Sequence, residues 1–87
     1  MKLKVIVNPN PFTAELLVLI HGQFDMNIVI RLTNSKDSVI RITSHTLKKG
    51  ENKVTIGNLQ RYATGNYRVE VKMLNGDLLE TIKLVKI

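Results

Sequence analysis

The chain has no cysteine and no tryptophan, and among its 87 residues there are only two prolines, two histidines and four aromatic side chains. Without cysteine it forms no disulfide, holds no zinc through thiolates and performs no cysteine-based catalysis. Alanine is also scarce, with two residues against nine valines, nine isoleucines and seven threonines. Because β-branched side chains lose rotamer freedom in helices and fit pleated sheets, this composition predicts an all-β fold.

Long hydrophobic runs are missing as well. The longest uninterrupted apolar stretch covers residues 16–20, whereas a membrane-spanning helix needs about 20 residues. No segment with the pattern of a secretory signal stands at the start of the sequence. The apolar fraction of 44% and the charged fraction of 23% are those of a folded chain. We therefore expect one β-sandwich domain over residues 1–87 and no membrane span.

Apolar and polar residues alternate in seven short segments, which is the pattern of strands with one buried face. The expected strands are residues 2–7, 15–21, 26–32, 38–43, 52–56, 67–73 and 78–87. The residues expected to face inward are Leu3, Val5, Val7, Leu16, Val18, Ile20, Ile28, Ile30, Leu32, Ile40, Ile42, Val54, Ile56, Tyr67, Val69, Val71 and Met73. Arg41 is expected to face outward. In the last segment Ile82 and Leu84 compete with Leu79 and Val85 for the core, a conflict that a β-bulge would resolve.

Turn residues separate these segments. Asn75-Gly76 is a strong signal for a two-residue hairpin, and residues 34–37 predict a second hairpin. Seven strands at such spacing favour a seven-stranded antiparallel two-sheet sandwich of the immunoglobulin-like or fibronectin type III-like kind. Tyr67 at the head of a strand is compatible with a tyrosine corner, in which the phenol hydrogen-bonds to the backbone upstream, and equally with a half-buried strand aromatic.

The chemistry-bearing residues are scattered. Neither His21 nor His45 lies in a nucleophile motif, and the acidic residues do not pair for glycosidic chemistry. Four acids fall in predicted turns, where a carboxylate mimics a backbone hydrogen bond: Asp25, Asp37, Glu51 and Asp77. We therefore predict no enzymatic activity, no metal site and no cofactor.

The formal net charge of +6 is compatible with binding to nucleic acid. Binding of single strands uses exposed aromatic rings on which bases stack. Here Tyr67 shares the parity of the core, while Phe12, Phe24 and Tyr62 are apart in predicted loops. The lysines are spread along the chain, as expected for strands whose charges discourage edge-to-edge pairing. We therefore predict no nucleic-acid partner.

Four motifs occur in a fixed order over nearly the whole chain. The first is Asn8-Pro9-Asn10-Pro11-Phe12, the second includes Gly50 and Asn52, the third includes Gly65 and Tyr67, and the fourth is the basic-apolar ending with Lys83 and Lys86. In this order they resemble the C-terminal sorting domain of proteins exported by the type IX secretion system of Bacteroidetes. The six-residue step from Leu59 to Gly65 is longer than usual for that family and indicates an insertion at residues 60–64.

The resemblance implies a non-catalytic address that is recognised at the outer membrane and then removed from its cargo. It also implies a larger precursor, exported through the periplasm to the outer membrane or the extracellular space. We expect the secretion machinery to contact this domain, as a monomer, through a surface or a strand edge. The expected recognition surface comprises Asn8, Pro9, Asn10, Pro11, Phe12, Gly50, Asn52, Gly65, Tyr67, Lys83 and Lys86.

The sequence alone leaves two other functional hypotheses open. One is a stand-alone adhesion, carbohydrate-interaction or spacer module, for which Phe24 and Tyr62 are the candidate aromatic contacts. The other is a small intracellular sandwich that shares the fold without the export role.

Overall fold

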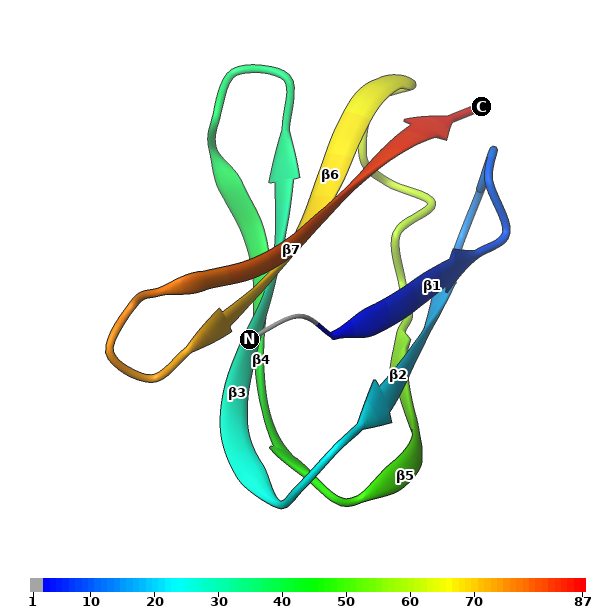
Figure 1. The fold of residues 1–87 in the computed structure, drawn as a ribbon. Helices are drawn as coiled ribbons and strands as arrows, with labels where there is room; N and C mark the ends of the chain where they lie inside the picture. Colours follow the sequence, from blue (N-terminus) through cyan, green and yellow to red (C-terminus); the bar gives the residue numbers. More distant parts are fainter. Residues whose placement is uncertain (1–2) are drawn as a thin grey trace.

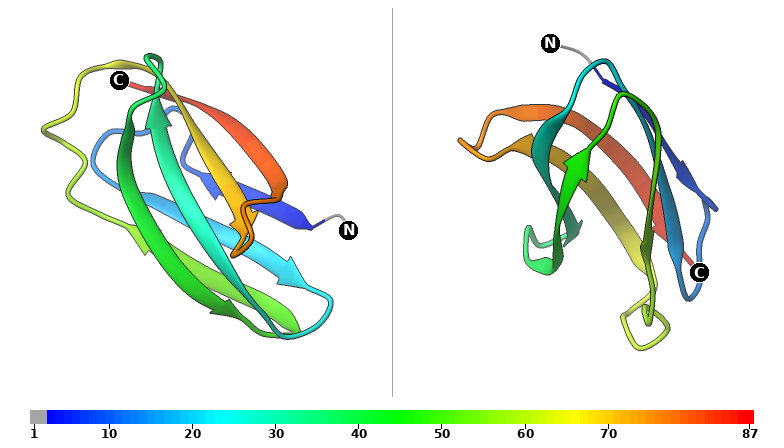
Figure 2. Two further views of the ribbon diagram at one scale, coloured as in Figure 1. Left: turned by 90° about the vertical axis from the view of Figure 1, so that its left-hand side faces the viewer. Right: turned by 90° about the horizontal axis from the view of Figure 1, so that it is seen from below.

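The computed structural model describes residues 3–87, which form seven β-strands and no helix. Lys2, placed by the alternation on the outer side of the first strand, lies outside the described residues. A three-stranded sheet has the order β1-β2-β5, and a four-stranded sheet has the order β4-β3-β6-β7. All pairings between strands are antiparallel. The two sheets face each other in an open sandwich (Figure 1 and Figure 2), so the predicted fold class is confirmed.

The strand bounds agree with the alternation within two residues at each end, except that the fourth strand continues to Leu47, four residues beyond its predicted end. They are β1 (Lys4–Asn8), β2 (Leu16–Gly22), β3 (Met26–Asn34), β4 (Val39–Leu47), β5 (Gly50–Ile56), β6 (Gly65–Met73) and β7 (Leu78–Lys86). Residues of one parity on each strand fill the space between the sheets, where burial of apolar surface stabilises the fold. The core consists of Leu3, Val7, Phe12, Leu16, Val18, Ile20, Ile28, Ile30, Leu32, Leu47, Val54, Ile56, Leu59, Tyr67, Val69, Val71 and Leu84.

The prediction for β4 is wrong at two positions. Ile42 is paired with Arg31 on the outer face and is 61% exposed, whereas Arg41 is paired with the buried Leu32 and shares the core side. The pairing of β3 with β4 shifts register between Leu32 and Thr33, which leaves Ile40 as the extra residue. This irregularity reverses the parity of the strand beyond it, so Ile40 still packs against the core while Ile42 does not.

A register shift also determines which apolar residues of β7 face the core. The pairing of β6 with β7 slips between Val71 and Lys72, where Leu79 is the extra residue. Leu79 and Ile82 pack against the core and Leu84 is buried, while Val85 is exposed. Both apolar parities of this strand are thereby accommodated, as the bulge hypothesis expected.

The tyrosine corner is present. The hydroxyl of Tyr67 donates a hydrogen bond of 2.5 Å to the backbone carbonyl of Ala63, four residues upstream. The ring of Tyr67 meets the ring of Phe12 edge to face, with centroids 5.7 Å apart and an interplanar angle of 71°. The corner fixes the entry into β6 and gives Phe12 a buried aromatic partner.

Asn52 organises the turn between β4 and β5. Its side-chain amide nitrogen donates to the carbonyls of Ile20, Lys48 and Gly50, and its amide oxygen accepts from the backbone N–H of Lys48. The side chain is 7% exposed. A buried amide with four such bonds holds the turn against β2 in one geometry.

We predict that Asn52→Ala lowers the free energy of unfolding by about 2–4 kcal/mol, because it leaves several buried backbone groups without partners. Urea unfolding of the purified domain measures the change. Asn66→Ala is the control, since Asn66 is exposed and its side chain forms no hydrogen bond within residues 3–87; it should change stability by less than about 0.5 kcal/mol. Equal losses in the two variants would contradict this role for Asn52.

Candidate recognition site

The loop between β1 and β2 binds the C-terminal end of the chain. Phe12 donates its backbone N–H to the carbonyl of Val85, and Ile87 donates its N–H to the carbonyl of Phe12, each at 2.9 Å. These two bonds make a short parallel bridge beside β7. In Figure 1 the loop after β1 accordingly lies next to the C-terminus. The proline-asparagine motif and the basic-apolar ending, 70 residues apart in the sequence, are therefore neighbours.

Asn10 completes this contact with its side chain. Its amide oxygen accepts the N–H of Val85 at 3.0 Å, and its amide nitrogen donates to the carbonyl of Lys83 at 3.3 Å. Residues 10–12 therefore occupy the backbone groups that β7 directs away from β6 between Lys83 and Ile87. Further back along the same edge, the N–H of Thr81 donates to the side chain of Glu80. The outer edge of β7 is thus satisfied within the domain at the carbonyls of Lys83 and Val85 and at the N–H groups of Thr81, Val85 and Ile87.

The sequence-predicted site residues fall into two separate groups. Nine of them lie around the contact between the first loop and β7: Asn8, Pro9, Asn10, Pro11, Phe12, Gly65, Tyr67, Lys83 and Lys86. Gly50 and Asn52 lie at the start of β5, next to the turn between β4 and β5, which is at the other end of the sandwich in Figure 1. Asn52 is committed to the backbone of that turn, as described above.

Burial divides the larger group again. Asn8, Pro9, Asn10, Pro11, Gly65 and Lys83 are exposed. In contrast, Phe12 is 1% exposed, and Lys86 is 6% exposed because it shares the inward parity of Leu84. Phe12 and Tyr67 hold the loop to the core, whereas the exposed residues form the accessible surface.

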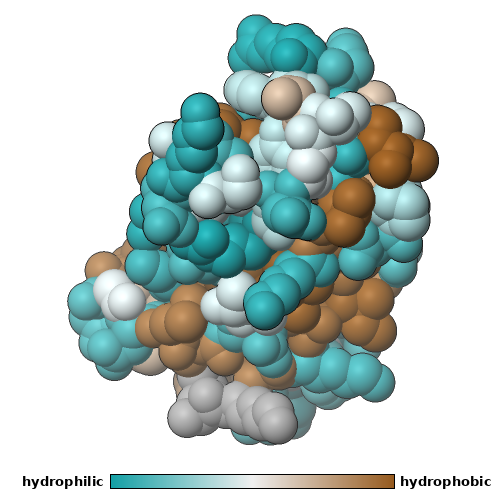
Figure 3. Space-filling view, turned by 90° about the horizontal axis from the view of Figure 1, so that it is seen from above, coloured by the Kyte–Doolittle hydropathy of each residue, from teal (hydrophilic) through white to brown (hydrophobic). Residues whose placement is uncertain are grey.

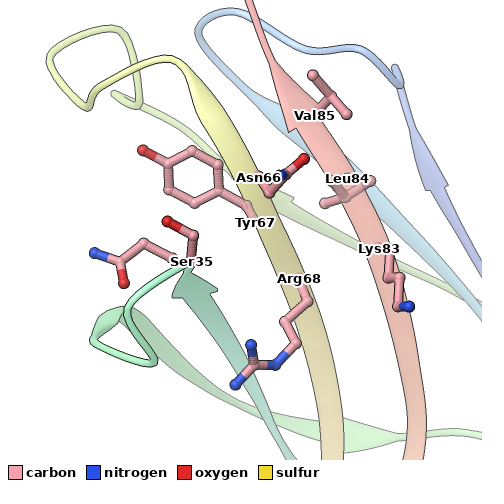
Figure 4. Close-up of a pocket in the computed structure, with 8 residues that line it drawn as sticks. Ser35, Asn66, Tyr67, Arg68, Lys83, Leu84 and Val85 are labelled. Carbon is pink, nitrogen blue, oxygen red and sulfur yellow. The ribbon is translucent and has the colours of Figure 1, made fainter.

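A shallow pocket of about 470 Å³ opens beside this surface. It is bordered by the hairpin between β3 and β4 and by β6 and β7, and it is lined by Asn34, Ser35, Asn66, Tyr67, Arg68, Lys83, Leu84 and Val85. Figure 4 shows Arg68 and Lys83 on the two adjacent strands, with Val85 further along β7. Sequence patterns did not indicate Arg68 or Asn66 as site residues, because only the β6–β7 register brings them beside Lys83 and Val85.

Two basic residues are paired on the adjacent strands of this pocket wall. Arg68 is directly opposite Lys83 in the β6–β7 pairing, an arrangement that is unfavourable for like charges. Arg68 is compensated by Asp37 and by Glu70, whose Oε2 is 3.6 Å from its Nε. Its hydrogen bond to Asp37 raises the pKa of Arg68. No ion pair formed within residues 3–87 includes Lys83, so the excess positive charge sits at its ammonium group.

The histidines and acids form no catalytic arrangement around the pocket. His21 contacts the exposed Glu51 at 2.9 Å, and His45 contacts the Asn52 amide oxygen at 3.3 Å, each on a different strand. No group of three or more potential metal ligands is found in the part of the chain that the structure describes. In that same part, no helix has the length and hydrophobicity required to cross a bilayer.

Comparison with protein families identifies the family to which this chain belongs. The family model of the secretion system C-terminal sorting domain matches residues 6–86. The chain belongs to this family. No curated protein gives a significant match to it. The resemblance stated from the four motifs is therefore confirmed, and the matched residues contain every strand except the first two residues of β1.

As a member of this family, the sorting domain is a type IX secretion signal: it directs a precursor to the outer membrane or the extracellular space. Such a signal interacts with the secretion machinery, and sorting domains are in general non-catalytic. No observation on this chain favours the adhesion or spacer alternative. Three of the four motifs that identified the family meet around the contact between the first loop and β7, whereas the second motif lies at the other end of the sandwich.

We predict that Asn10→Ala loosens this contact in the sorting domain. The variant removes the acceptor of the Val85 N–H, so hydrogen exchange at Val85 should accelerate by at least about tenfold. Asn8→Ala is the matched control, because the Asn8 side chain is exposed and makes no hydrogen bond within residues 3–87. Unchanged protection of Val85 in Asn10→Ala would show that Asn10 does not hold β7.

Proposed function

We propose that the secretion machinery recognises the sorting domain at one carboxy-terminal surface, made of Asn8, Pro9, Asn10, Pro11, Lys83, Val85 and Ile87. The observation that carries the proposal is the hydrogen bonding of residues 10–12 to β7, which makes the two ends of the sequence one continuous surface. A receptor that binds this surface meets it only when the whole domain has folded. Recognition would thereby report the folded state of the domain.

The contact is made by side chains rather than by addition of a strand to β7. Strand addition needs free N–H and carbonyl groups along an edge. Between Lys83 and Ile87 four such groups are bonded to Asn10 and Phe12. In contrast, the side chains of Lys83, Val85 and Ile87 are exposed there. Seen from above in Figure 3, this end of the molecule mixes hydrophilic side chains with interrupted apolar patches, which suits such a surface.

Lys83 supplies the electrostatic part of the contact. Its ammonium group has no carboxylate partner within residues 3–87, and Lys83 is paired with Arg68 across the strands. An acidic group on the partner would relieve this repulsion and would favour the correct orientation on encounter. Lys86 is nearly buried, so its role is confined to the inner side of β7.

The sorting domain acts as a passive monomeric label that is cut from its cargo after export. The edge strand β4 carries Arg41 and His45 on its core side, and β7 carries Glu80 and Lys86. Charges that point inward on edge strands discourage pairing with a second copy. The scattered histidines and acids support the absence of catalysis within the domain itself.

We predict that Lys83→Glu on a reporter protein fused to the sorting domain reduces export by about tenfold, since it reverses the one uncompensated charge of the surface. Export from a host with type IX secretion is measured as the fraction of reporter outside the cell. Lys53→Glu is the control, because Lys53 is exposed on the outer face of β5 in the other sheet and the change in charge is the same.

Urea unfolding of both variants establishes that they remain folded. Export that is lost equally in Lys83→Glu and Lys53→Glu would point to net charge rather than to this surface. Normal export of a folded Lys83→Glu domain would refute the assignment of Lys83.

A further inference from the structure

A second cluster of uncompensated positive charge lies at the open side of the sandwich. β4 is an edge strand of the four-stranded sheet, and the loop of residues 57–64 runs beside the beginning of this strand (Figure 2, left). Arg41 points to the core side of β4, opposite the buried Leu32. Tyr62 of the loop packs partly against the core at the same place.

The loop is fixed by backbone hydrogen bonds. Leu59 is fully buried and donates its N–H to the carbonyl of Ala14 at 2.8 Å, and Tyr62 donates its N–H to the carbonyl of Leu59 at 3.1 Å. The tyrosine corner holds the far end of the loop at Ala63. Tyr62 is therefore presented in a defined position on an otherwise irregular segment.

Arg61 contacts the phenol of Tyr62 directly, and Arg41 lies on the core side of β4. The guanidinium of Arg61 lies over the ring, with its central carbon 5.2 Å from the centroid, and donates to the hydroxyl oxygen at 3.3 Å. Hydrogen bonding from Arg61, and then from Arg41, lowers the pKa of Tyr62. Since the hydroxyl oxygen accepts from arginine, its own proton is free to be donated outward.

No carboxylate balances these two charges. The ion pairs within residues 3–87 use Asp25, Asp37, Glu51 and Glu70, and none includes Arg41 or Arg61. Glu15, which follows the loop's anchor at Ala14, is not in ion-pairing contact with either arginine. The chain thus brings together three hydrogen-bond donors and two full positive charges without an anionic acceptor.

We propose that Arg41, Arg61 and Tyr62 form a binding site for a phosphate group. A carboxylate is satisfied by one guanidinium through a bidentate pair, whereas two guanidiniums and a hydroxyl from different segments match the several oxygens and the double charge of a phosphate. The site is independent of the carboxy-terminal surface, because it shares no residue with it. Phosphate occurs free in solution, largely as a dianion, and in anionic lipid head groups as a singly charged diester, and both forms present at least two terminal oxygens to the donors.

The test is an NMR titration of the domain with inorganic phosphate at constant ionic strength. We expect saturable shifts of the Arg61 and Tyr62 amides and of the Tyr62 ring signals. Arg61→Gln, a change on an exposed loop side chain, should weaken binding by about tenfold, and the double variant R41Q/R61Q should remove it. The control is K49Q/K53Q, which removes the same charge from exposed lysines at the β4–β5 turn and β5; its affinity should match that of the unaltered domain.

A second arm uses vesicles of phosphatidylglycerol, with phosphatidylcholine vesicles as the reference. Binding to phosphatidylglycerol that R41Q/R61Q abolishes and K49Q/K53Q leaves intact would assign the phosphate to a lipid head group; saturable binding of inorganic phosphate alone would assign it to a soluble ligand. The proposal fails if neither probe shifts the Tyr62 signals, or if the two double variants weaken binding equally, since net charge would then account for the effect. A folded Lys83→Glu domain should bind phosphate normally, so failure here is distinct from failure of the export surface.

Discussion

The hydrogen bonding of residues 10–12 along the outer edge of β7 is the interaction on which the rest of the account depends. An exposed strand edge offers unpaired backbone groups to any other chain. Here Asn10 and Phe12 satisfy four of those groups with their own side chain and backbone. Because Phe12 is buried against Tyr67, which in turn is fixed by the tyrosine corner, the closure of this edge is connected directly to the core. The family motifs at the two ends of the chain are thus parts of one structural unit.

This arrangement separates residues that build the domain from residues that a partner can reach. Phe12, Asn52, Tyr67 and Lys86 belong to recurring motifs, yet their side chains are buried. Pro9, Pro11 and Lys83 belong to the same motifs and are exposed. A motif recognised in the sequence therefore contains both residues that build the fold and residues that a partner can reach, and burial distinguishes the two kinds. The charge pattern adds a second distinction, since Arg68 is neutralised locally whereas Lys83, Arg41 and Arg61 are not.

Period-two alternation was sufficient to predict the two-sheet sandwich, and the order of four motifs was sufficient to predict the family. The alternation gave the wrong faces for two residues of β4. A register shift after Leu32 exchanges the faces of Arg41 and Ile42, and the hydrophobicity pattern of the sequence does not reveal such a shift. The candidate site was predicted only in part for a related reason. Contacts such as that of Asn10 with Val85 join segments that are far apart in the sequence, and no local pattern at either residue indicates them.

Site-specific photo-crosslinking during export tests the central claim most directly, namely that the first loop and the end of β7 form one recognised surface. A photoreactive residue would be placed in turn at Pro9 and at Val85, and at Thr55, which is exposed on the outer face of the other sheet. The account predicts that Pro9 and Val85 crosslink to the same component of the secretion machinery and that Thr55 does not. Crosslinks to that component from Thr55, with none from Pro9 or Val85, would contradict it.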